Sequence, residues 1–326
     1  MTQALRYLAL IFLGLGVQLS EVVYAQAPYP NTGVKLTVPF AAGGVPDTTA
    51  RLLAQKLQDR IGQAVVVENR AGGNGAVAVA FITSQPADGS TLLVTDSTLL
   101  TVSPLFISQL PYDPQKDLVP IAALARAPLF LAVSADTPVK TLQEFINYAK
   151  AHPNELNYGS AGVGSTHQLT MEAMKSALGL KITHIPYRGT GQAVPALLGG
   201  HIQVLWAAYP SLKAGVESGR IRLLANNGSG RSPLLPELPP LADIIPGFDL
   251  VTPIGLYGRH DMPEALVHRI SSDASAIMKN PDMEAPLAAL GMEPAPGDSA
   301  TFKKMIQLEI EAMTKIVESA GLRQKQ

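Results

Sequence analysis

The sequence of 326 residues contains no cysteine, which excludes disulfide bonds, thiol catalysis and metal sites with cysteine ligands. Charged residues make up only 16% of the chain, and the formal net charge is −1. No broad basic surface is therefore implied, and we expect no nucleic-acid partner. Any site for an anion has to be local, built from backbone dipoles or from one or two cations.

The N-terminal residues have the pattern of an export signal. Arg6 is followed by the apolar run LALIFLGLGV at 8–17, which is too short to span a membrane, and then by the small-residue cleavage pattern Val23-Tyr24-Ala25. We expect a signal peptide over 1–25, a mature start near Gln26 and a bacterial periplasmic location. The alternative is an uncleaved membrane anchor.

The rest of the chain has the composition of a protein with a large core. Hydrophobic residues make up 47%, and the length favours two domains. Apolar strand-like runs alternate with amphipathic helical stretches, which is typical of an α/β protein with mainly parallel sheets. The predicted strands lie at 36–40, 64–68, 91–95, 129–133, 157–160, 183–185, 202–206, 221–225 and 250–257. The predicted helices lie at 46–61, 76–84, 142–151, 168–178, 263–279 and 301–319, and a further helix is expected to end at 199–200. A long surface loop is expected at 228–247.

Two glycine-rich turns lie between a predicted strand and a predicted helix. Such turns expose unpaired N–H groups at the positive end of a helix dipole, where an anion is favoured. Together they suggest one small anion held from two sides, although each is also compatible with an ordinary tight turn or helix cap. The candidate residues of the first turn are Phe40, Ala41, Ala42, Gly43, Gly44 and Asp47. Those of the second are Ser160, Ala161, Gly162, Gly164, Ser165, Thr166 and Gln168.

Seven segments in order carry a resemblance to a known family. They are KLTVPFAAGGVPDTTARLLAQKL, VVVENRAGGNGAVA, PADGSTLL, LPYDPQKDLVPIA, NYGSAGVGSTHQLTMEAM, IPYRGTGQAVPALLGG and GRIRLLANNGSGRSPLLPELPPLAD. Nearly all of the expected mature chain resembles the Bug receptors (TctC family), the periplasmic solute-binding proteins of tripartite tricarboxylate transporters.

The resemblance implies a two-domain periplasmic binding protein fold, type II-like, with two crossing strands and a ligand cleft. It implies a first domain over 27–127 plus 248–326, a second over 128–247, and crossings near 129–133 and 250–257. In this family the two turns hold a carboxylate of the ligand, partly through ordered waters. The implied function is capture of a small organic acid by a monomeric receptor and its delivery to transporter membrane subunits, with no enzyme activity and no cofactor.

The sequence departs from the family pattern at positions that bear on the rest of the ligand. Gln168 stands where the family usually has histidine, with His167 one place earlier, and Gln203 stands where the family often has aspartate. A third turn contributes Arg188, Gly189 and Thr190 as candidates. Arg188 is equally compatible with pairing to a distal ligand carboxylate and with a solvated surface position.

The sequence does not choose the ligand among dicarboxylates, tricarboxylates, amino acids, aromatic acids and amides. A second function class also stays open, an exported α/β hydrolase or phosphate-handling enzyme, because glycine turns before helices also bind phosphate. The first strand is not followed by a G-x-G-x-x-G pattern, and the chain has no G-x-x-x-x-G-K-[ST] or H-E-x-x-H motif. We therefore favour the binding protein.

Overall fold

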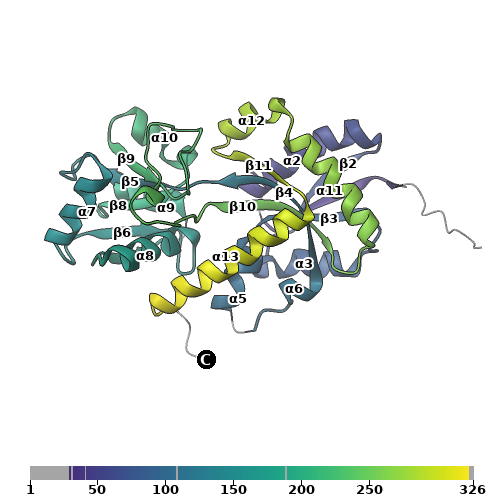
Figure 1. Cartoon of the computed structure of the whole chain (residues 1–326), viewed down its shortest axis with the longest axis horizontal. Coiled ribbons are helices and arrows are strands. Elements are labelled where there is room, and N and C mark those ends of the chain that lie inside the picture. Colours follow the sequence, from purple (N-terminus) through teal and green to yellow (C-terminus); the bar gives the residue numbers. More distant parts are fainter. Residues whose placement is uncertain (1–28, 31, 41, 108, 188, 323–326) are drawn as a thin grey trace, which may run out of the picture.

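The computed structural model describes residues 29–30, 32–40, 42–107, 109–187 and 189–322 (Figure 1). The expected signal peptide over 1–25 lies outside the described residues, and so do the site candidates Ala41 and Arg188. Among the described residues, no helix combines the length and apolar character that crossing a bilayer requires.

Two separate β-sheets organise the chain, one toward each end of the molecule (Figure 1). The six-stranded sheet has the order β11-β4-β10-β3-β1-β2, and the five-stranded sheet has the order β7-β6-β8-β5-β9. The first comprises β1 (Val34–Val38), β2 (Val65–Asn69), β3 (Thr91–Asp96), β4 (Leu118–Ala127), β10 (Thr252–Arg259) and β11 (Glu293–Gly297). The second comprises β5 (Phe130–Ser134), β6 (Asn157–Ser160), β7 (Thr183–Pro186), β8 (Val204–Ala207) and β9 (Ile221–Asn226).

The expectation of mainly parallel sheets is wrong, because both sheets are mixed. β1 pairs in parallel with β2 and β3, and β6 pairs in parallel with β7 and β8, as successive strand–helix units require. One strand beside each crossing runs the other way, whereas β4 and β9 run in the same direction as the parallel strands. β10 pairs antiparallel with β3 and β4, and β5 pairs antiparallel with β8 and β9.

Helices cover the sheets, and each sheet contributes its own buried clusters. Around the six-stranded sheet lie α2 (Val45–Ile61), α3 (Ala76–Ser84), α4 (Thr98–Thr101), α5 (Ser103–Phe106), α6 (Pro114–Asp117), α11 (Glu264–Met278) and α12 (Glu284–Ala289). Around the five-stranded sheet lie α7 (Leu142–Ala151), α8 (Thr166–Leu178), α9 (Thr190–Leu198) and α10 (Tyr209–Glu217). Short 3-10 turns occur at Gly73–Gly75, Leu241–Asp243 and Pro281–Met283. The region predicted as a long loop, 228–247, contains the second of these turns and buries Leu241.

Helix starts follow their capping residues. Thr141 accepts the N–H of Glu144 at the start of α7, as its capping box predicts, with an Oγ1–N distance of 3.1 Å. The helix α8 begins at Thr166, two residues earlier than expected, because Ser165 is its N-cap.

The chain crosses between the sheets twice, and one asparagine ties the crossings together. β4 ends at Ala127 and β5 begins at Phe130, so the first crossing is very short. Asn227 follows β9 and is completely buried. Its Oδ1 accepts the N–H of Leu129 at 2.8 Å, and its Nδ2 donates to the carbonyl of Leu250 at 2.8 Å. The two connections therefore lie side by side at the junction of the sheets.

The last helix, α13 (Ser299–Ser319), forms a third link between the two halves (Figure 1). Phe302 and Ile306 in its first half pack into a cluster of the six-stranded sheet. Met313 and Val317 near its end join the cluster that contains residues of α8 and of the five-stranded sheet. Any relative movement of the two sheets must therefore involve α13 as well as the crossings.

Candidate functional site

A cleft of about 420 Å³ lies at the junction of the two halves, and both contribute to its lining. From the six-stranded side come Val45 at the start of α2, Asp96 at the end of β3 and Ile254 of β10. From the five-stranded side come the turn between β6 and α8 and the first residue of α9, Thr190. The starts of α2, α8 and α9 therefore face one cavity.

The first glycine turn is held in shape by Asp47, a buried residue of the first turn of α2. One carboxylate oxygen accepts the N–H of Gly43 at 2.8 Å and Nε of Arg51 at 3.0 Å, and the other accepts Nδ2 of Asn69 at 2.9 Å. Burial disfavours the charge, but the hydrogen bonds from Arg51, Gly43 and Asn69 hold the pKa of Asp47 below its ordinary value. Asp47 therefore has a full set of partners within the fold.

The glycines of this turn differ in their conformation. Gly43 has φ +87°, a left-handed conformation that strongly favours glycine. Gly44 is the N-cap of α2 with φ −74° and ψ 167°, which any residue adopts. A side chain at Gly44 is therefore compatible with the backbone, and it would stand next to Val45 at the edge of the cleft.

The second turn presents the start of α8 to the cleft. Ser165 caps the helix: its Oγ accepts the N–H of Gln168 at 3.4 Å and donates to the carbonyl of Gly162 at 2.7 Å. The N–H groups of Thr166 and His167 belong to the first turn, where a helix offers no acceptor of its own. Both residues line the cleft, so the start of α8 provides donors and a positive dipole end for an anion.

His167 lies at this helix start and brings a further polar atom to the cleft. Its Nδ1 is buried and has no hydrogen-bond partner among the described residues. Burial lowers the pKa of His167 to about 4, so the ring is neutral at physiological pH. The hydroxyl of Ser165 is engaged by the backbone of its own turn, at Gly162 and Gln168.

A different serine and histidine do meet, at Ser160 and His184. Oγ of Ser160 lies 2.7 Å from Nε2 of His184, and Nδ1 of the same ring lies 3.2 Å from Nε2 of Gln168. Oε1 of Gln168 accepts the N–H of Gly164 at 2.7 Å, which fixes the amide so that its NH₂ faces the ring. Nδ1 of a neutral His184 is then an acceptor, and its Nε2 carries the proton.

This tautomer donates to Ser160 instead of taking its proton, which is the reverse of what a serine nucleophile requires. Ser160 is also completely buried. The arrangement therefore fixes the shape of the second turn, and Gln168, where the family usually has histidine, is one of its buried members. Sequence reasoning missed the part played by His184, because this residue lies on the neighbouring strand β7 and no local pattern marks it.

The structure brings some of the predicted site residues to the cleft and not others. Those that line it are Ala161, Gly164, Ser165, Thr166 and Thr190. Phe40, Ala42, Gly43, Gly44, Asp47, Ser160, Gly162, Gln168 and Gly189 belong to the turns beside it without lining it. Gln203 precedes β8, at the opposite end of that strand from the cleft, where its Oε1 accepts the N–H of Asn157 at 2.9 Å.

Asp96 is a cleft residue that the sequence reasoning missed. It is the last residue of β3, whose other five residues are buried. A polar residue at the carboxyl end of a buried strand is a signal for a ligand site in α/β proteins, since ligands bind beyond these strand ends. The strand predicted at 91–95 stops one residue short of Asp96, and Asp96 was therefore not among the predicted site residues.

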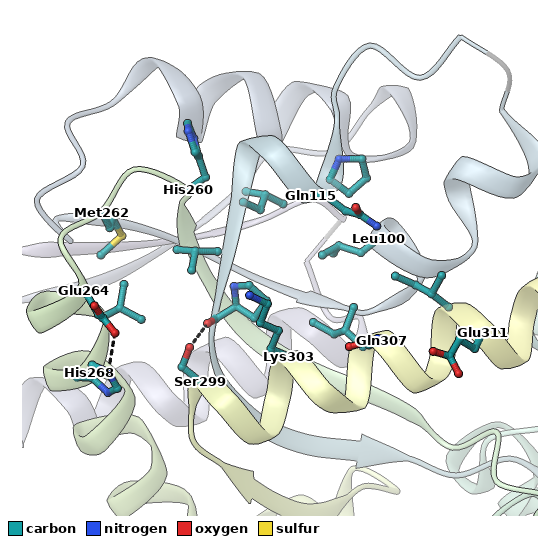
Figure 2. A pocket seen from close by; sticks show the side chains of 17 residues that line it. Leu100, Gln115, His260, Met262, Glu264, His268, Ser299, Lys303, Gln307 and Glu311 are labelled. Atoms are coloured by element: carbon teal, nitrogen blue, oxygen red, sulfur yellow. Dashed lines mark hydrogen bonds and ion pairs between the residues drawn. The ribbon is translucent and has the colours of Figure 1, made fainter.

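A larger cavity of about 840 Å³ lies elsewhere, along α13 (Figure 2). Ser299, Lys303 and Gln307 of α13 line one side, and residues of the β10–α11 connection, such as His260 and Met262, line the other. All of its lining residues surround the six-stranded sheet, so movement between the two halves would not close it. The smaller cleft, which joins both halves and three helix starts, is the better candidate for the binding site.

Among the described residues no group of three or more histidine, aspartate or glutamate side chains is arranged to hold a metal ion.

Comparisons with known proteins show the family to which the chain belongs. Residues 49–322 match the family model described as "Tripartite tricarboxylate transporter family receptor". Protein BugT of Bordetella pertussis is 32% identical over 305 residues, which cover 91% of this chain and 92% of BugT. Among solved structures, R. palustris Rpa4515 with adipate has a TM-score of 0.77 and 31% identity, covering 90% of this chain and 98% of that one. MatC from Rhodopseudomonas palustris with bound malate has a TM-score of 0.70 and 28% identity, covering 89% of this chain and all of that one. These findings confirm the resemblance and the two-domain α/β fold that it implied.

Proposed function

This chain belongs to the tripartite tricarboxylate transporter receptor family, and on that premise we propose that it is a solute-binding receptor for a small organic acid. The acid binds in the cleft between the two halves with one carboxylate directed at the start of α8. The observation that carries the proposal is the convergence of three helix starts, those of α2, α8 and α9, on a single cavity. The adipate and malate of the two related structures are consistent with a carboxylate ligand.

The energetics fit a carboxylate held without an arginine. A helix start favours an anion by about 0.3–1 kcal/mol when exposed and up to about 2 kcal/mol when partly buried. The lining contains no lysine or arginine among the described residues. Thr166 and His167 at the start of α8 and Val45 at the start of α2 supply N–H donors from opposite sides, so a bound carboxylate stabilises the closed arrangement of the two halves.

The same proposal covers the setting of the protein. We infer that residues 1–25 are a cleavable signal peptide, that the mature chain is a periplasmic monomer, and that its ligand-closed form is recognised by transporter membrane subunits. Domain I then comprises 27–127 and 248–326, with α13 reaching across to domain II at 128–247. Catalysis has no part in this proposal, and the buried Ser160, with its proton-donating His184, gives the hydrolase alternative no support.

The test is a thermal-shift screen of the purified mature protein against a library of organic acids, followed by calorimetry and by recovery of the ligand. Binding to the folded state alone raises stability by about 2.7 kcal/mol at a ligand concentration of 100 Kd. We expect one or more carboxylates to raise the Tm and to be recovered unchanged. Steady conversion of the compound, or stabilisation only by acids that lack a carboxylate, would overturn the proposal.

A further inference from the structure

The cleft has an acidic residue, Asp96, at a site where the proposed ligand is an acid. Asp96 ends β3 and lines the cleft together with residues of the α8 helix start. An ionised carboxylate beside a purely anionic ligand would repel it. The position of Asp96 therefore bears on the kind of acid that the cleft accepts.

Only part of the Asp96 side chain is used within the fold. Oδ1 accepts the N–H of Thr98 at 3.1 Å and also the hydroxyl of Thr98, which positions the carboxylate at the start of α4. No hydrogen bond joins Oδ2 to another residue in the described part of the chain. A purely local cap would account for Oδ1 and leaves Oδ2 available to a group inside the cleft.

No cation of the described residues neutralises Asp96. The guanidinium of Arg126, at the end of β4, is paired with Asp249. The other ionisable groups that interact with Asp96 are themselves acidic, namely Glu309 of α13 and the phenols of Tyr112 and Tyr257. The negative charge of Asp96 thus lacks a counter-ion among the residues that the structure describes.

The neighbouring Glu309 does not remove this charge from the cleft. Burial raises the pKa of Glu309 to about 8, and the charge of Asp96 contributes to the shift. The pKa of Asp96 is also raised, because its burial outweighs the hydrogen bonds from Thr98. The raised pKa of Glu309 favours its protonated form at neutral pH, and a positive group beside Asp96 in the cleft would favour the ionised form of Asp96.

From these observations, and resting on the proposed carboxylate-binding function, we propose that Asp96 binds an ammonium group and that the ligand is an amino acid. Its carboxylate lies at the start of α8, and its ammonium group supplies the counter-ion that Asp96 lacks. Within the described lining, the cleft then combines one negative side chain with positive helix starts, and a zwitterion satisfies both kinds of charge. A diacid places its second carboxylate against Asp96 and is disfavoured.

The experiment compares ligands that differ in one group. The α- and ω-amino acids of two to six carbons are measured by calorimetry beside the dicarboxylate and the monocarboxylate of the same length. The wild-type protein, Asp96→Asn and the control Asp59→Asn are used. The amide introduced by Asp96→Asn keeps an oxygen acceptor for Thr98, and Asp59 is an exposed residue of α2 outside the cleft.

We expect at least one amino acid to bind the wild-type protein more tightly than the dicarboxylate and the monocarboxylate of the same length, by about tenfold or more. Asp96→Asn should abolish that preference, and Asp59→Asn should leave it unchanged. If at every chain length the dicarboxylate or the monocarboxylate binds the wild-type protein more tightly than the amino acid does, the amino-acid assignment is overturned and the receptor proposal stands. An amino-acid preference that survives in folded Asp96→Asn overturns the role of Asp96. If no carboxylate of any kind binds, the receptor proposal itself fails. The comparison among ligands of the wild-type protein stands even if Asp96→Asn does not fold.

Discussion

Replacement of Asp47 by alanine tests whether the first turn is shaped by this residue. The side chain of Asp47 is 1% exposed and accepts hydrogen bonds from Gly43, Arg51 and Asn69. Hydrogen bonds to a charged group contribute about 1.5–3 kcal/mol each, and those from Gly43 and Asn69 do not depend on the exposed side chain of Arg51. Arg51 is half exposed, so its ion pair adds little.

The hydrogen bonds from Gly43 and Asn69 share one acceptor group, so their losses are not additive. We expect Asp47→Ala to lower the free energy of unfolding by about 2–4 kcal/mol. For a chain of this size that corresponds to a fall in Tm of roughly 3–6 °C. Asp59→Ala on the exposed face of the same helix is the control, and its effect should stay within about 0.5 kcal/mol.

Urea unfolding, monitored by circular dichroism, gives the free energy of unfolding of both variants. Calorimetry with the ligand from the screen gives their affinity. The pKa of Asp47 is depressed in the folded state, so its stabilisation exists at neutral pH and is lost as the pH falls below about 4. The alanine variant should lack this acid-dependent loss. Normal stability of Asp47→Ala combined with lost ligand affinity would refute the structural role and identify Asp47 as a ligand contact.

Three further changes test other parts of the structure. Gly44→Leu should lower ligand affinity about tenfold or more, about 1.4 kcal/mol, and should leave the Tm normal because φ at Gly44 tolerates a side chain. Gly230→Leu, in an open loop position, is the control, and equal affinities of the two variants in calorimetry would count against the first turn. In the wild-type protein, the raised pKa of Glu309 means that stability falls as the pH rises from about 4.5 toward 8, at up to about 1.4 kcal/mol per pH unit. Glu309→Gln should flatten this pH dependence, and an unchanged slope in urea titrations would contradict the prediction. Ser165→Ala removes the cap of α8 and should cost about 1 kcal/mol in the same unfolding assay; no loss would mean that Ser165 does not cap the helix.

Local signals in the sequence were enough for most of the longer helices and for the two turns. The helices at 76–84 and 142–151 have the predicted bounds, because their ends are set by neighbouring residues such as Gly75 and Thr141. The paired turns were identified because strand, glycine and helix follow one another directly in the chain. A helix start depends on a few adjacent residues, and so it can be recognised from them alone.

Features that depend on distant parts of the chain were not predictable in this way. β4 was missed because it is buried without alternation and pairs with β10, more than a hundred residues further on. β11 contains two prolines and lies at the edge of its sheet, where proline is tolerated. The role of Asn227 at the crossings follows from contacts between remote segments, for which a single sequence gives no periodic signal.

The most direct test of the central claim is a crystal structure of the protein with the acid that the screen identifies. The account predicts that the ligand lies in the cleft between the two sheets, with its carboxylate hydrogen-bonded to the N–H groups of Thr166 or His167. A ligand bound instead in the cavity along α13, or a carboxylate directed away from the start of α8, would contradict it.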